Sequence, residues 1–242
     1  MKRSLLMCGP AMVLLGVLAG DARAQVLFSD NFETSGAGGA TTLSAPWEMN
    51  KEVYSSAGAY IGGYYPGFTF GPNAIVTGQG GPSQGTYQGK VWPDYDYAPD
   101  WTNGKIQKIS LLVTRRLSSA DIASGRIEMN FDSKLQPLLG PDTQATAWMK
   151  LLSPDFSQLW WQESLTLSGS TWSSNSVGMN FDGSQVNANL QWGFTVSSTN
   201  YQDNGLFMDN VVVAGVPEPG STALFSLGMI GLCALGYRRR IG

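Results

Sequence analysis

The chain of 242 residues contains no histidine, and its two cysteines, Cys8 and Cys233, stand near its two ends. Without histidine, a serine nucleophile lacks its usual base and zinc lacks one of its main protein ligands. Without a cysteine between positions 8 and 233, the long middle of the chain forms no disulfide and no thiol-based active site. These absences argue against triad hydrolases, cysteine enzymes and zinc enzymes.

Charged residues are also scarce, at 14% of the chain. Residues 25–216 hold nine Lys and Arg against sixteen Asp and Glu, which gives this part a net charge of −7. A surface with this excess of negative charge repels phosphate backbones, so we expect no nucleic acid as a partner. An anionic polymer would need a cation to bridge it to the protein.

The N-terminus has the layout of a secretory signal peptide. Lys2 and Arg3 precede an apolar stretch at 5–19, and Ala22 and Ala24 flank a single arginine just before Gln25. A positive start, a short apolar region and a small-residue cleavage site are typical of export signals. We therefore expect residues 1–24 to be a signal peptide and the exported domain to begin at Gln25.

The last twenty-six residues, 217–242, combine a kinked proline run, an uncharged apolar stretch and an arginine cluster. Seventeen uncharged residues, 221–237, would reach about 26 Å as a helix, close to the ~30 Å hydrocarbon layer of a bilayer. Because arginine clusters stay on the cytoplasmic side, the pattern predicts a single C-terminal transmembrane helix with residues 25–216 outside. The proline run is Pro217, Glu218 and Pro219, and the cluster is Arg238, Arg239 and Arg240.

This arrangement resembles the PEP-CTERM sorting signal of Gram-negative bacteria that make exopolysaccharide. In that family, a membrane protease-transpeptidase called exosortase recognises the signal, cuts near the Pro-Glu-Pro run and releases or re-anchors the protein. The resemblance covers about the last tenth of the chain. It implies exosortase as a partner and a protein of the cell envelope, outer surface or extracellular matrix that is transiently anchored in the inner membrane. A plain C-terminal membrane anchor is the alternative interpretation.

Residues 25–216 show strand patterns and no amphipathic helical period. Alternating or β-branched runs recur about every ten to fifteen residues, with Gly, Pro and Asn turns between them. This spacing leaves no room for βαβ crossovers and favours one all-β sandwich domain, with 215–216 as a linker to the tail. The predicted strands are 26–33, 52–61, 68–70, 74–77, 86–92, 106–117, 126–131, 145–152, 159–167, 176–181, 190–196 and 206–213.

Four short features occur in the order found in jelly-roll carbohydrate-binding modules. They are the run 30–33, Trp47 after a loop, Trp172 before a late strand, and the run 205–211 in the last strand. The resemblance implies a jelly-roll β-sandwich whose first and last strands lie side by side. It also implies a structural calcium ion held by Glu33 and Asp209, with Asp30 beside them, since calcium prefers oxygen ligands. Alternatively, Asp30 and Asp209 only cap turns and solvate strand ends.

One acidic and aromatic cluster, 92–101, contains Asp94 and Asp96. A glycosidase needs two carboxyl groups roughly 5 to 9 Å apart. The cluster is similar to the Glu-x-Asp-x-x-Glu motif of laminarinase-type jelly rolls, but Asp94 replaces the first glutamate and Pro99 the second. Because one catalytic carboxyl is missing, we expect no enzyme activity. An exposed acidic loop and a loop that binds sugar or calcium both remain open.

The run 81–85 matches the G-x-S-x-G pattern of a nucleophile elbow. No histidine is present to complete a triad, and no helix pattern follows the run. The glycines of this region also miss the spacing of a dinucleotide-binding loop. We therefore interpret residues 78–85 as a flexible loop.

The chain has eight tryptophans, and their flat faces suit stacking on sugar rings. Trp160 and Trp161 would point to opposite faces of one strand, so at least one of them should be partly exposed. We assign Trp47, Trp172 and Trp192 to the sandwich core. The candidates for glycan binding are Tyr64, Tyr65, Trp92, Trp101, Trp160 and Trp161.

The sequence thus predicts a non-enzymatic exported surface or matrix protein that associates with extracellular polysaccharide. The alternative is a binding module that recognises a neutral glycan by aromatic stacking. A glycoside hydrolase with paired carboxylates is the third interpretation.

Overall fold

The structure, a computed structural model, describes residues 25–40, 42–43, 45–64, 74–92, 105–136, 143–199 and 205–216. The predicted signal peptide, the sorting tail and the predicted strand at 68–70 lie outside these ranges, as do Asp94 and Asp96. No helix within the described ranges has the length and apolarity to cross a membrane.

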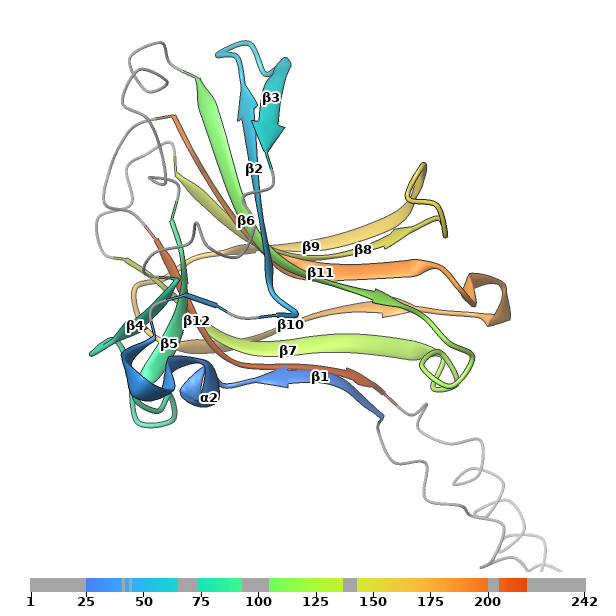
Figure 1. The fold of residues 1–242 in the computed structure, drawn as a ribbon, viewed down its shortest axis with the longest axis horizontal. Coiled ribbons are helices and arrows are strands. Elements are labelled where there is room, and N and C mark those ends of the chain that lie inside the picture. Colours follow the sequence, from blue (N-terminus) through green and yellow to red (C-terminus); the bar gives the residue numbers. More distant parts are fainter. Residues whose placement is uncertain are drawn as a thin grey trace, which may run out of the picture.

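Two antiparallel β-sheets packed face to face form the domain (Figure 1). Sheet A contains β1 (Val26–Asp30), β4 (Ile75–Thr77), β5 (Tyr87–Val91), β7 (Arg126–Leu135), β10 (Ser173–Asn180) and β12 (Leu206–Gly215). Sheet B contains β2 (Glu48–Tyr54), β3 (Tyr60–Tyr64), β6 (Ile106–Arg116), β8 (Gln144–Leu152), β9 (Leu159–Leu167) and β11 (Asn189–Ser198). The predicted all-β sandwich is confirmed.

The chain crosses repeatedly between the two sheets, as in a jelly roll. In sheet A the order is β10-β7-β12-β5-β4, and β1 pairs with the part of β12 that extends beyond β5. In sheet B the order is β3-β2-β6-β11-β8-β9. The first and last strands therefore lie side by side, as the jelly-roll resemblance implies.

The first predicted strand is shorter than its sequence pattern. β1 ends at Asp30, whose Oδ1 accepts a hydrogen bond of 2.7 Å from the Phe32 amide. Phe32 has a φ of 59°, which turns the backbone, and the short helix α2 (Glu33–Gly36) follows. A side chain that bonds the backbone two residues on competes with strand pairing, which is why the run 26–33 divides at this point.

The predicted strand 52–61 is instead a hairpin. β2 and β3 pair with each other across a turn in which the Ser55 amide donates to the Ala59 carbonyl at 2.8 Å. Gly58, with a φ of 83°, supplies the left-handed backbone that this turn requires. The other predicted strands that lie in the described ranges are present, with ends shifted by up to four residues.

Aromatic rings from both sheets fill the space between the sheets. Trp47 and Trp192 are buried, as predicted. Phe28 of β1 meets both of them, with ring centroids 5.4 Å from Trp47 and 5.7 Å from Trp192. Such edge-to-face and tilted contacts add to the stabilisation from apolar burial.

The predicted burial of Trp172 in the core is wrong. Its ring is partly exposed on the outer side of sheet A, 5.3 Å from the Lys134 ammonium, and its Nε1 donates to the Gln79 carbonyl at 2.8 Å. Trp172 precedes β10, an edge strand, and a residue there is not covered by the opposing sheet.

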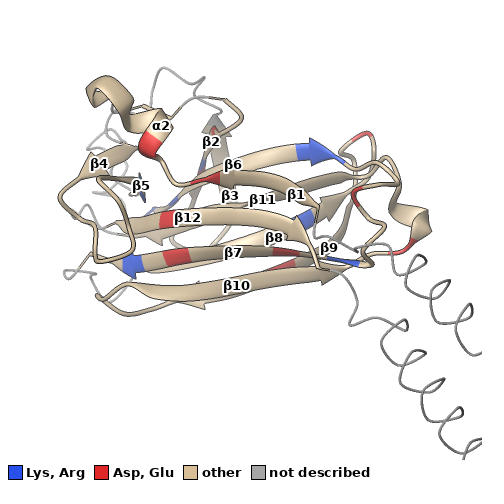
Figure 2. Cartoon of the chain, turned by 90° about the horizontal axis from the view of Figure 1, so that it is seen from below, with Lys and Arg blue, Asp and Glu red and all other residues tan. Residues whose placement is uncertain are grey.

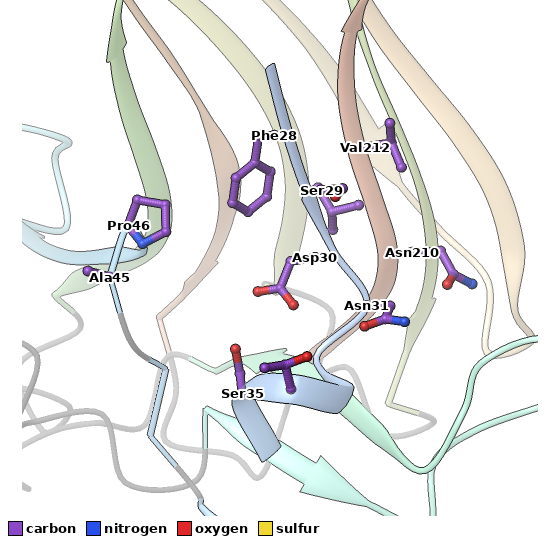
Figure 3. Close-up of a pocket in the computed structure, with 11 residues that line it drawn as sticks. Phe28, Ser29, Asp30, Asn31, Ser35, Ala45, Pro46, Asn210 and Val212 are labelled. Carbon is purple, nitrogen blue, oxygen red and sulfur yellow. The ribbon is translucent and has the colours of Figure 1, made fainter. Parts of the chain in front are cut away.

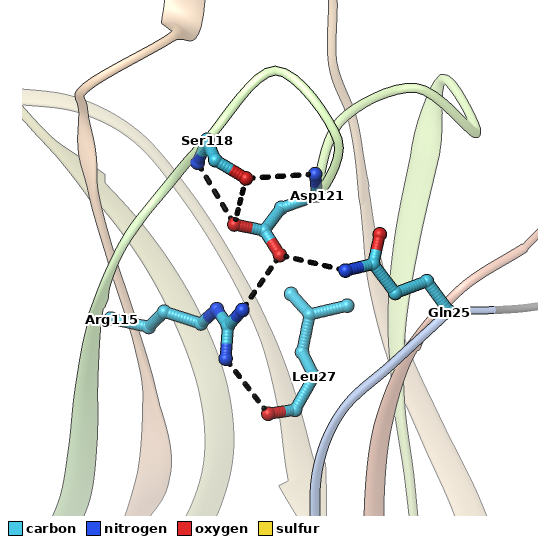
Figure 4. Close-up of polar contacts among 5 residues, drawn as sticks. All are labelled: Gln25, Leu27, Arg115, Ser118 and Asp121. Atoms are coloured by element: carbon cyan, nitrogen blue, oxygen red, sulfur yellow. Dashed lines mark hydrogen bonds and ion pairs between the residues drawn. The ribbon is translucent and has the colours of Figure 1, made fainter.

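A buried carboxylate ties the start of β1 to the turn between β6 and β7 (Figure 4). Asp121 accepts hydrogen bonds from the amide and hydroxyl of Ser118 and from Arg115 Nη2, at 2.7 to 2.8 Å. It also accepts one from Gln25 Nε2 at 3.3 Å, while Arg115 Nη1 donates to the Leu27 carbonyl at 3.1 Å. Since no disulfide joins these segments, this cluster is a principal link between β1 and sheet B.

The cluster determines how the carboxylate of Asp121 titrates. Burial by itself would raise its pKa, but hydrogen bonds from Ser118 and Arg115 outweigh that effect and hold the pKa below its usual value. A lowered folded-state pKa contributes stability above the unfolded pKa, and this contribution is lost as the pH falls through the folded pKa.

We predict that Asp121→Asn lowers the free energy of unfolding at pH 7 by about 1 to 3 kcal/mol, because Arg115 and the Ser118 amide lose a charged acceptor. The difference from the unaltered protein should begin to shrink below about pH 4, where the carboxylate of the unfolded chain is protonated, and should shrink further as the pH falls through the lower pKa of the folded state. Urea denaturation at pH 7 and pH 3 measures both effects. The exposed Glu48→Gln is the control, and an equal loss in both variants would contradict the prediction.

Candidate functional site

An open groove of about 380 Å³ runs over the outer face of sheet B. Five of the six strands, β2, β6, β11, β8 and β9, contribute side chains to it. The lining is rich in amides and hydroxyls: Asn50, Ser110, Gln144, Thr146, Gln162, Gln191, Thr195 and Ser197. The remaining lining residues are Glu48, Glu52, Lys108, Leu112, Trp148, Lys150, Leu152 and Leu159.

Thr195 organises the floor of the groove. Its Oγ1 accepts a hydrogen bond of 2.8 Å from Trp148 Nε1 and lies 2.7 Å from the Ser110 hydroxyl. The three side chains come from β11, β8 and β6, and strand register places Thr195 opposite both Ser110 and Thr146. The polar end of the buried tryptophan is therefore satisfied, and its ring is held in place.

The groove contains equal numbers of positively and negatively charged side chains. Lys150 lies over the Trp148 ring, with 4.3 Å from its ammonium to the ring centroid. Burial lowers the pKa of Lys150, while the negative charge of Glu52 raises it and the positive charge of Lys108 lowers it. With Glu48, the groove holds two carboxylates and two ammonium groups, so it offers no large excess of either sign.

Aromatic side chains border two corners of sheet B. Tyr54 and Tyr60 pack edge to face, 5.6 Å apart, at the β2–β3 corner, and Tyr60 is 61% exposed. At the diagonally opposite corner, Trp160 is the bulged residue of β9 and is 45% exposed, beside the groove residue Leu159. Exposed flat rings beside a polar groove are the arrangement that stacking on a sugar ring requires.

The residues predicted to bind a glycan lie in different parts of the chain. Trp160 and Trp161 lie on β9; the alternating pattern predicts that at least one of them is partly exposed, and both are. Trp92 follows β5 in sheet A, with the Lys90 ammonium 3.4 Å from its ring centroid, so it is not part of the groove. Tyr65, Trp101 and the side chain of Tyr64 lie outside the described residues.

Sequence reasoning missed Tyr54, Tyr60 and Trp148. Trp148 stands between the apolar residues Ala147 and Met149 of β8, so the sequence suggests a core residue. It lines the outer face of the sheet instead. The only signal for its position is that Thr146, Trp148 and Lys150 share one strand face, since neighbouring strand residues point to opposite sides.

A second polar cluster lies at the far end of sheet A, around Asp209 of β12. Asp209 is 1% exposed, its Oδ1 accepts a 2.6 Å hydrogen bond from the Asn210 backbone amide, and its Oδ2 has no hydrogen-bond partner among the described residues. Burial raises the pKa of Asp209 to about 7, helped by the negative charges of Glu33, Asp132 and Asp30 and opposed by the Asn210 amide. Figure 2 shows these acidic positions gathered at one end of the sheet.

A β-bulge creates this cluster. The pairing of β12 with β7 shifts between Asp209 and Val212, and Asn210 adopts a φ of 49°. The side-chain amide of Asn210 then donates through Nδ2 to Asp132 Oδ2 at 2.9 Å and to the Ser83 carbonyl at 3.0 Å. The bulge thus turns a polar side chain toward the loop before β5 and leaves Asp209 and Asp132 as opposed residues in the ladder.

The predicted loop at 78–85 extends to Thr86, and hydrogen bonds attach this loop 78–86 to α2 and sheet A. Gln84 Nε2 donates to Asp132 Oδ2 at 2.9 Å, and Glu33 Oε1 accepts the amides of Thr86 and Tyr87 at 2.6 and 2.9 Å. A Cβ on Gly85 would lie 2.1 Å from Glu33 Oε1, so a larger residue there would displace the Glu33 side chain from its position against the loop. The loop therefore connects Glu33 of α2 with the Asp209 cluster.

Asp30 faces a different space from Asp209. Its two oxygens accept the Phe32 amide and Trp47 Nε1, the latter at 2.8 Å. It lines a cavity of about 610 Å³ between β1, α2 and Pro46, and in Figure 3 its carboxylate points into that space between Phe28 and Ser35. Neither Glu33 nor Asp209 lines this cavity. The bonds of Asp30 are those of a turn residue.

In the part of the chain that the structure describes, no group of three or more His, Cys, Asp or Glu is placed to hold a metal ion. Buried amide oxygens nevertheless lie next to the acidic residues. The Oε1 atoms of Gln84 and Gln88 are buried without a partner, like Asp209 Oδ2. Gln88 Nε2 donates to the main-chain carbonyls of Gln84 and Gly85, so the Gln88 side chain lies against the backbone of the loop 78–86. Unsatisfied oxygens of this kind can accept a hydrogen bond or ligate calcium.

The C-terminal end of the chain is similar to a known protein family. Residues 215–240 match the model of the PEP-CTERM protein-sorting motif. The chain carries a PEP-CTERM sorting motif. The predicted sorting signal is thereby confirmed, and it indicates an exported protein that is processed at the cell envelope. No curated protein matches the chain.

Several solved carbohydrate-binding modules share the sandwich architecture. A module from a study of promiscuous specificity in the β-sandwich superfamily has a TM-score of 0.39 and 12% identity, over 68% of this chain and 72% of that one. The tandem CBM22 modules of Paenibacillus barcinonensis Xyn10C give 0.43 and 14%, over 79% of this chain and 50% of theirs. The family 11 module of Clostridium thermocellum, solved with a β-1,3-1,4-mixed-linked tetrasaccharide, gives 0.38 and 11%, over 81% and 97%. At these values the similarity is one of fold.

We predict that Thr195→Val destabilises the protein by about 1 to 3 kcal/mol, because Trp148 Nε1 and the Ser110 hydroxyl lose their shared partner beneath the groove. Thr195→Ser, which keeps the hydroxyl, should recover most of this loss. Chemical denaturation measures both. Thr146→Val, on the same face of the neighbouring strand, is the matched control, and a comparable loss there would refute the role of Thr195.

Proposed function

We propose that this exported protein is a non-enzymatic carbohydrate-binding protein of the cell surface or extracellular matrix, and that the groove on sheet B holds a neutral glycan. The groove itself is the observation that carries the proposal. It offers hydrogen-bonding amides and hydroxyls along five strands, and exposed rings stand at two corners of sheet B. Sugars are bound by this combination of directional polar contacts and flat apolar faces.

The charges of the groove support a neutral ligand. Glu48 and Glu52 are balanced by Lys108 and Lys150, so the groove does not attract a polymer of either sign. The excess of acidic residues in the exported domain adds a general repulsion of polyanions.

The spacing of the carboxylates supports binding without catalysis. Glu48 and Glu52 are four residues apart on β2, which is about 13 Å along a strand. Paired-carboxylate glycosidases hold the two groups roughly 5 to 9.5 Å apart. The backbone positions of Glu48 and Glu52 are thus spaced more widely than the carboxyl groups of such an enzyme, which favours binding over catalysis.

The sorting motif supports a role for this protein at the cell envelope. A chain delivered to the envelope and processed by exosortase reaches the compartment in which extracellular polysaccharide accumulates. Glycan binding in the groove would then retain the processed protein among those polymers.

We predict that Trp160→Ala and Tyr60→Ala each weaken binding to a neutral polysaccharide about fivefold, because each removes a stacking surface worth about 1 kcal/mol. Affinity electrophoresis of the purified full-length protein in gels containing mixed-linkage glucan or xylan measures the change. Alginate, an anionic polymer, should not retard the protein.

Phe156→Asn is the matched control, because Phe156 is an exposed ring outside the groove lining. Unchanged mobility of the unaltered protein across all neutral polysaccharides would refute glycan binding and leave a structural role. Release of reducing ends from any of them would refute the non-enzymatic assignment.

We further propose that the Asp209 cluster holds a structural calcium ion. Asp209 Oδ2 and the Oε1 atoms of Gln84 and Gln88 would be its ligands, with Glu33 adding charge from α2. Two observations support this: the three oxygens are buried without partners, and Asp209 lies among like charges. When bound, a divalent ion supplies the positive charge that offsets this repulsion, and it would link the α2 segment, the loop 78–86 and β12.

We predict that a chelator lowers the melting temperature of the full-length protein by roughly 5 to 10 °C, because an ion at a hundredfold excess over Kd stabilises the fold by about 2.7 kcal/mol. Added calcium should restore it, and Asp209→Asn should abolish the response. Asp182→Asn, an exposed aspartate in the β10–β11 connection, is the control. A melting temperature that changes with neither chelator nor calcium would refute the proposed calcium site.

A further inference from the structure

The turn between β8 and β9 carries an exposed apolar tip, which consists of Phe156, Leu159, Trp160 and Trp161. Their exposed fractions are 53%, 54%, 45% and 50%. Four large apolar side chains within six residues are unusual on a protein surface in water, and such clusters mark contact with a partner or a membrane. Leu159 lines the groove and Trp160 borders it, so the groove leaves the exposure of Phe156 and Trp161 unexplained.

The tip is held rigidly. Asp155 Oδ1 accepts hydrogen bonds from the Ser153 hydroxyl at 2.6 Å and from the amide and hydroxyl of Ser157 at 3.1 and 2.8 Å. Asn189 of β11 donates to the carbonyls of Ser153 and Pro154, at 2.9 and 3.1 Å. These bonds fix the turn before any partner arrives, so little conformational entropy is lost on contact.

The apolar tip stands at the end of the sandwich where the described chain reaches the sorting motif. Asn189 pairs with both Leu152 and Arg116, which places the β8–β9 turn beside the end of β6. The chain then turns into β7, and the start of β7 lies beside the end of β12. There the Val216 amide donates a hydrogen bond of 2.8 Å to the Arg126 carbonyl. In Figure 1 the β8–β9 turn and the end of β12 lie on the same side of the molecule.

The distance from this end to the predicted membrane span is short. Only residues 217–220 separate Val216 from the uncharged segment 221–237. Four residues reach at most about 14 Å, even when fully extended. When that segment is in the bilayer, the end of the sandwich that bears the apolar tip must therefore stand at the membrane surface.

We propose that the apolar tip docks into the interfacial region of the lipid bilayer while the C-terminal segment is embedded there. The chemistry of the tip fits this region, where tryptophan combines an apolar ring with a polar N–H and is enriched. Docking would hold the sandwich in one orientation with the Pro-Glu-Pro run near the membrane surface. This role goes beyond glycan binding and does not depend on it.

A charge at the tip sets the depth of insertion. Hydrogen bonds from Ser153 and Ser157 lower the pKa of Asp155 to about 2, so the carboxylate is ionised at neutral pH. An ionised group does not enter the hydrocarbon layer, and the tip consequently stays at the level of the headgroups. The same negative charge favours zwitterionic over anionic lipids.

The test uses tryptophan fluorescence of the full-length chain reconstituted into phosphatidylcholine vesicles. Residues 217–242 contain no tryptophan, so the embedded segment itself gives no signal. Lipids brominated on the acyl carbons nearest the glycerol should quench part of the emission. Trp161→Phe keeps the tip apolar, removes one of its two fluorophores and should decrease the quenched part by roughly half, if both rings lie at the interface.

Phe156→Asn should decrease the quenching while leaving the fold intact, because Phe156 has a φ of 63° and asparagine adopts that backbone more readily than phenylalanine. Tyr60→Ala, at the opposite corner of sheet B, is the control and should leave quenching unchanged. Near-ultraviolet circular dichroism confirms that each variant is folded.

Three results would overturn the proposal. The first is the absence of bromine quenching in the unaltered chain, including a chain that does not sediment with the vesicles. The second is quenching that stays the same in both Trp161→Phe and Phe156→Asn. The third is a dimer in detergent that Phe156→Asn dissociates, without any lipid quenching, since the open edge of β9 would then be covered by a second copy.

Discussion

The antiparallel pairing of β1 with β12 is the constraint on which most of this structure depends. It joins the first and last strands of a domain that has no disulfide, with Asp30 opposite Val211 and Val26 opposite Ala214. At one end of the pair, the Asp121 cluster attaches the start of β1 to the β6–β7 turn. At the other end, the turn at Asp30 directs α2 toward the loop before β5. The turn between β6 and β7 and the segment α2 therefore both attach to this pair.

The bulge in β12 is the second feature with wide consequences. Beside it, Asp209 and Asp132 are opposed in the ladder, with Glu33 close enough to raise the pKa of Asp209. An uninterrupted ladder would not require Asn210 in a left-handed conformation, which costs backbone energy. The hydrogen bonds of Asn210 to Asp132 and Ser83 offset that cost and hold the loop 78–86 against sheet A. Local strain here serves to gather oxygen atoms from three separate segments.

The two ends of the sandwich have different chemistry. The end with α2 and the 78–86 loop is acidic and rich in amide oxygens, whereas the opposite end carries the apolar tip and leads into the sorting motif. The groove lies between them on the outer face of sheet B and meets the apolar tip at Leu159 and Trp160. The polar cluster can therefore be altered independently of the groove, whereas the tip can be altered without touching the groove only at Phe156 and Trp161.

The sequence by itself determined the class of fold, because strand alternation and turn residues are local properties of the chain. It also determined the sorting motif and the absence of histidine chemistry. It indicated that at least one of Trp160 and Trp161 is exposed, because adjacent residues of one strand point to opposite faces. The tertiary structure alone decided which carboxylates and amides meet around Asp209, since Gln84, Gln88 and Asp132 become neighbours only through strand register and loop packing. It likewise decided that Trp148 lines the groove and Trp172 the outside of sheet A, and that the apolar tip shares an end with Val216. Burial and proximity depend on which strands pair and in what register, and no local periodicity encodes that choice.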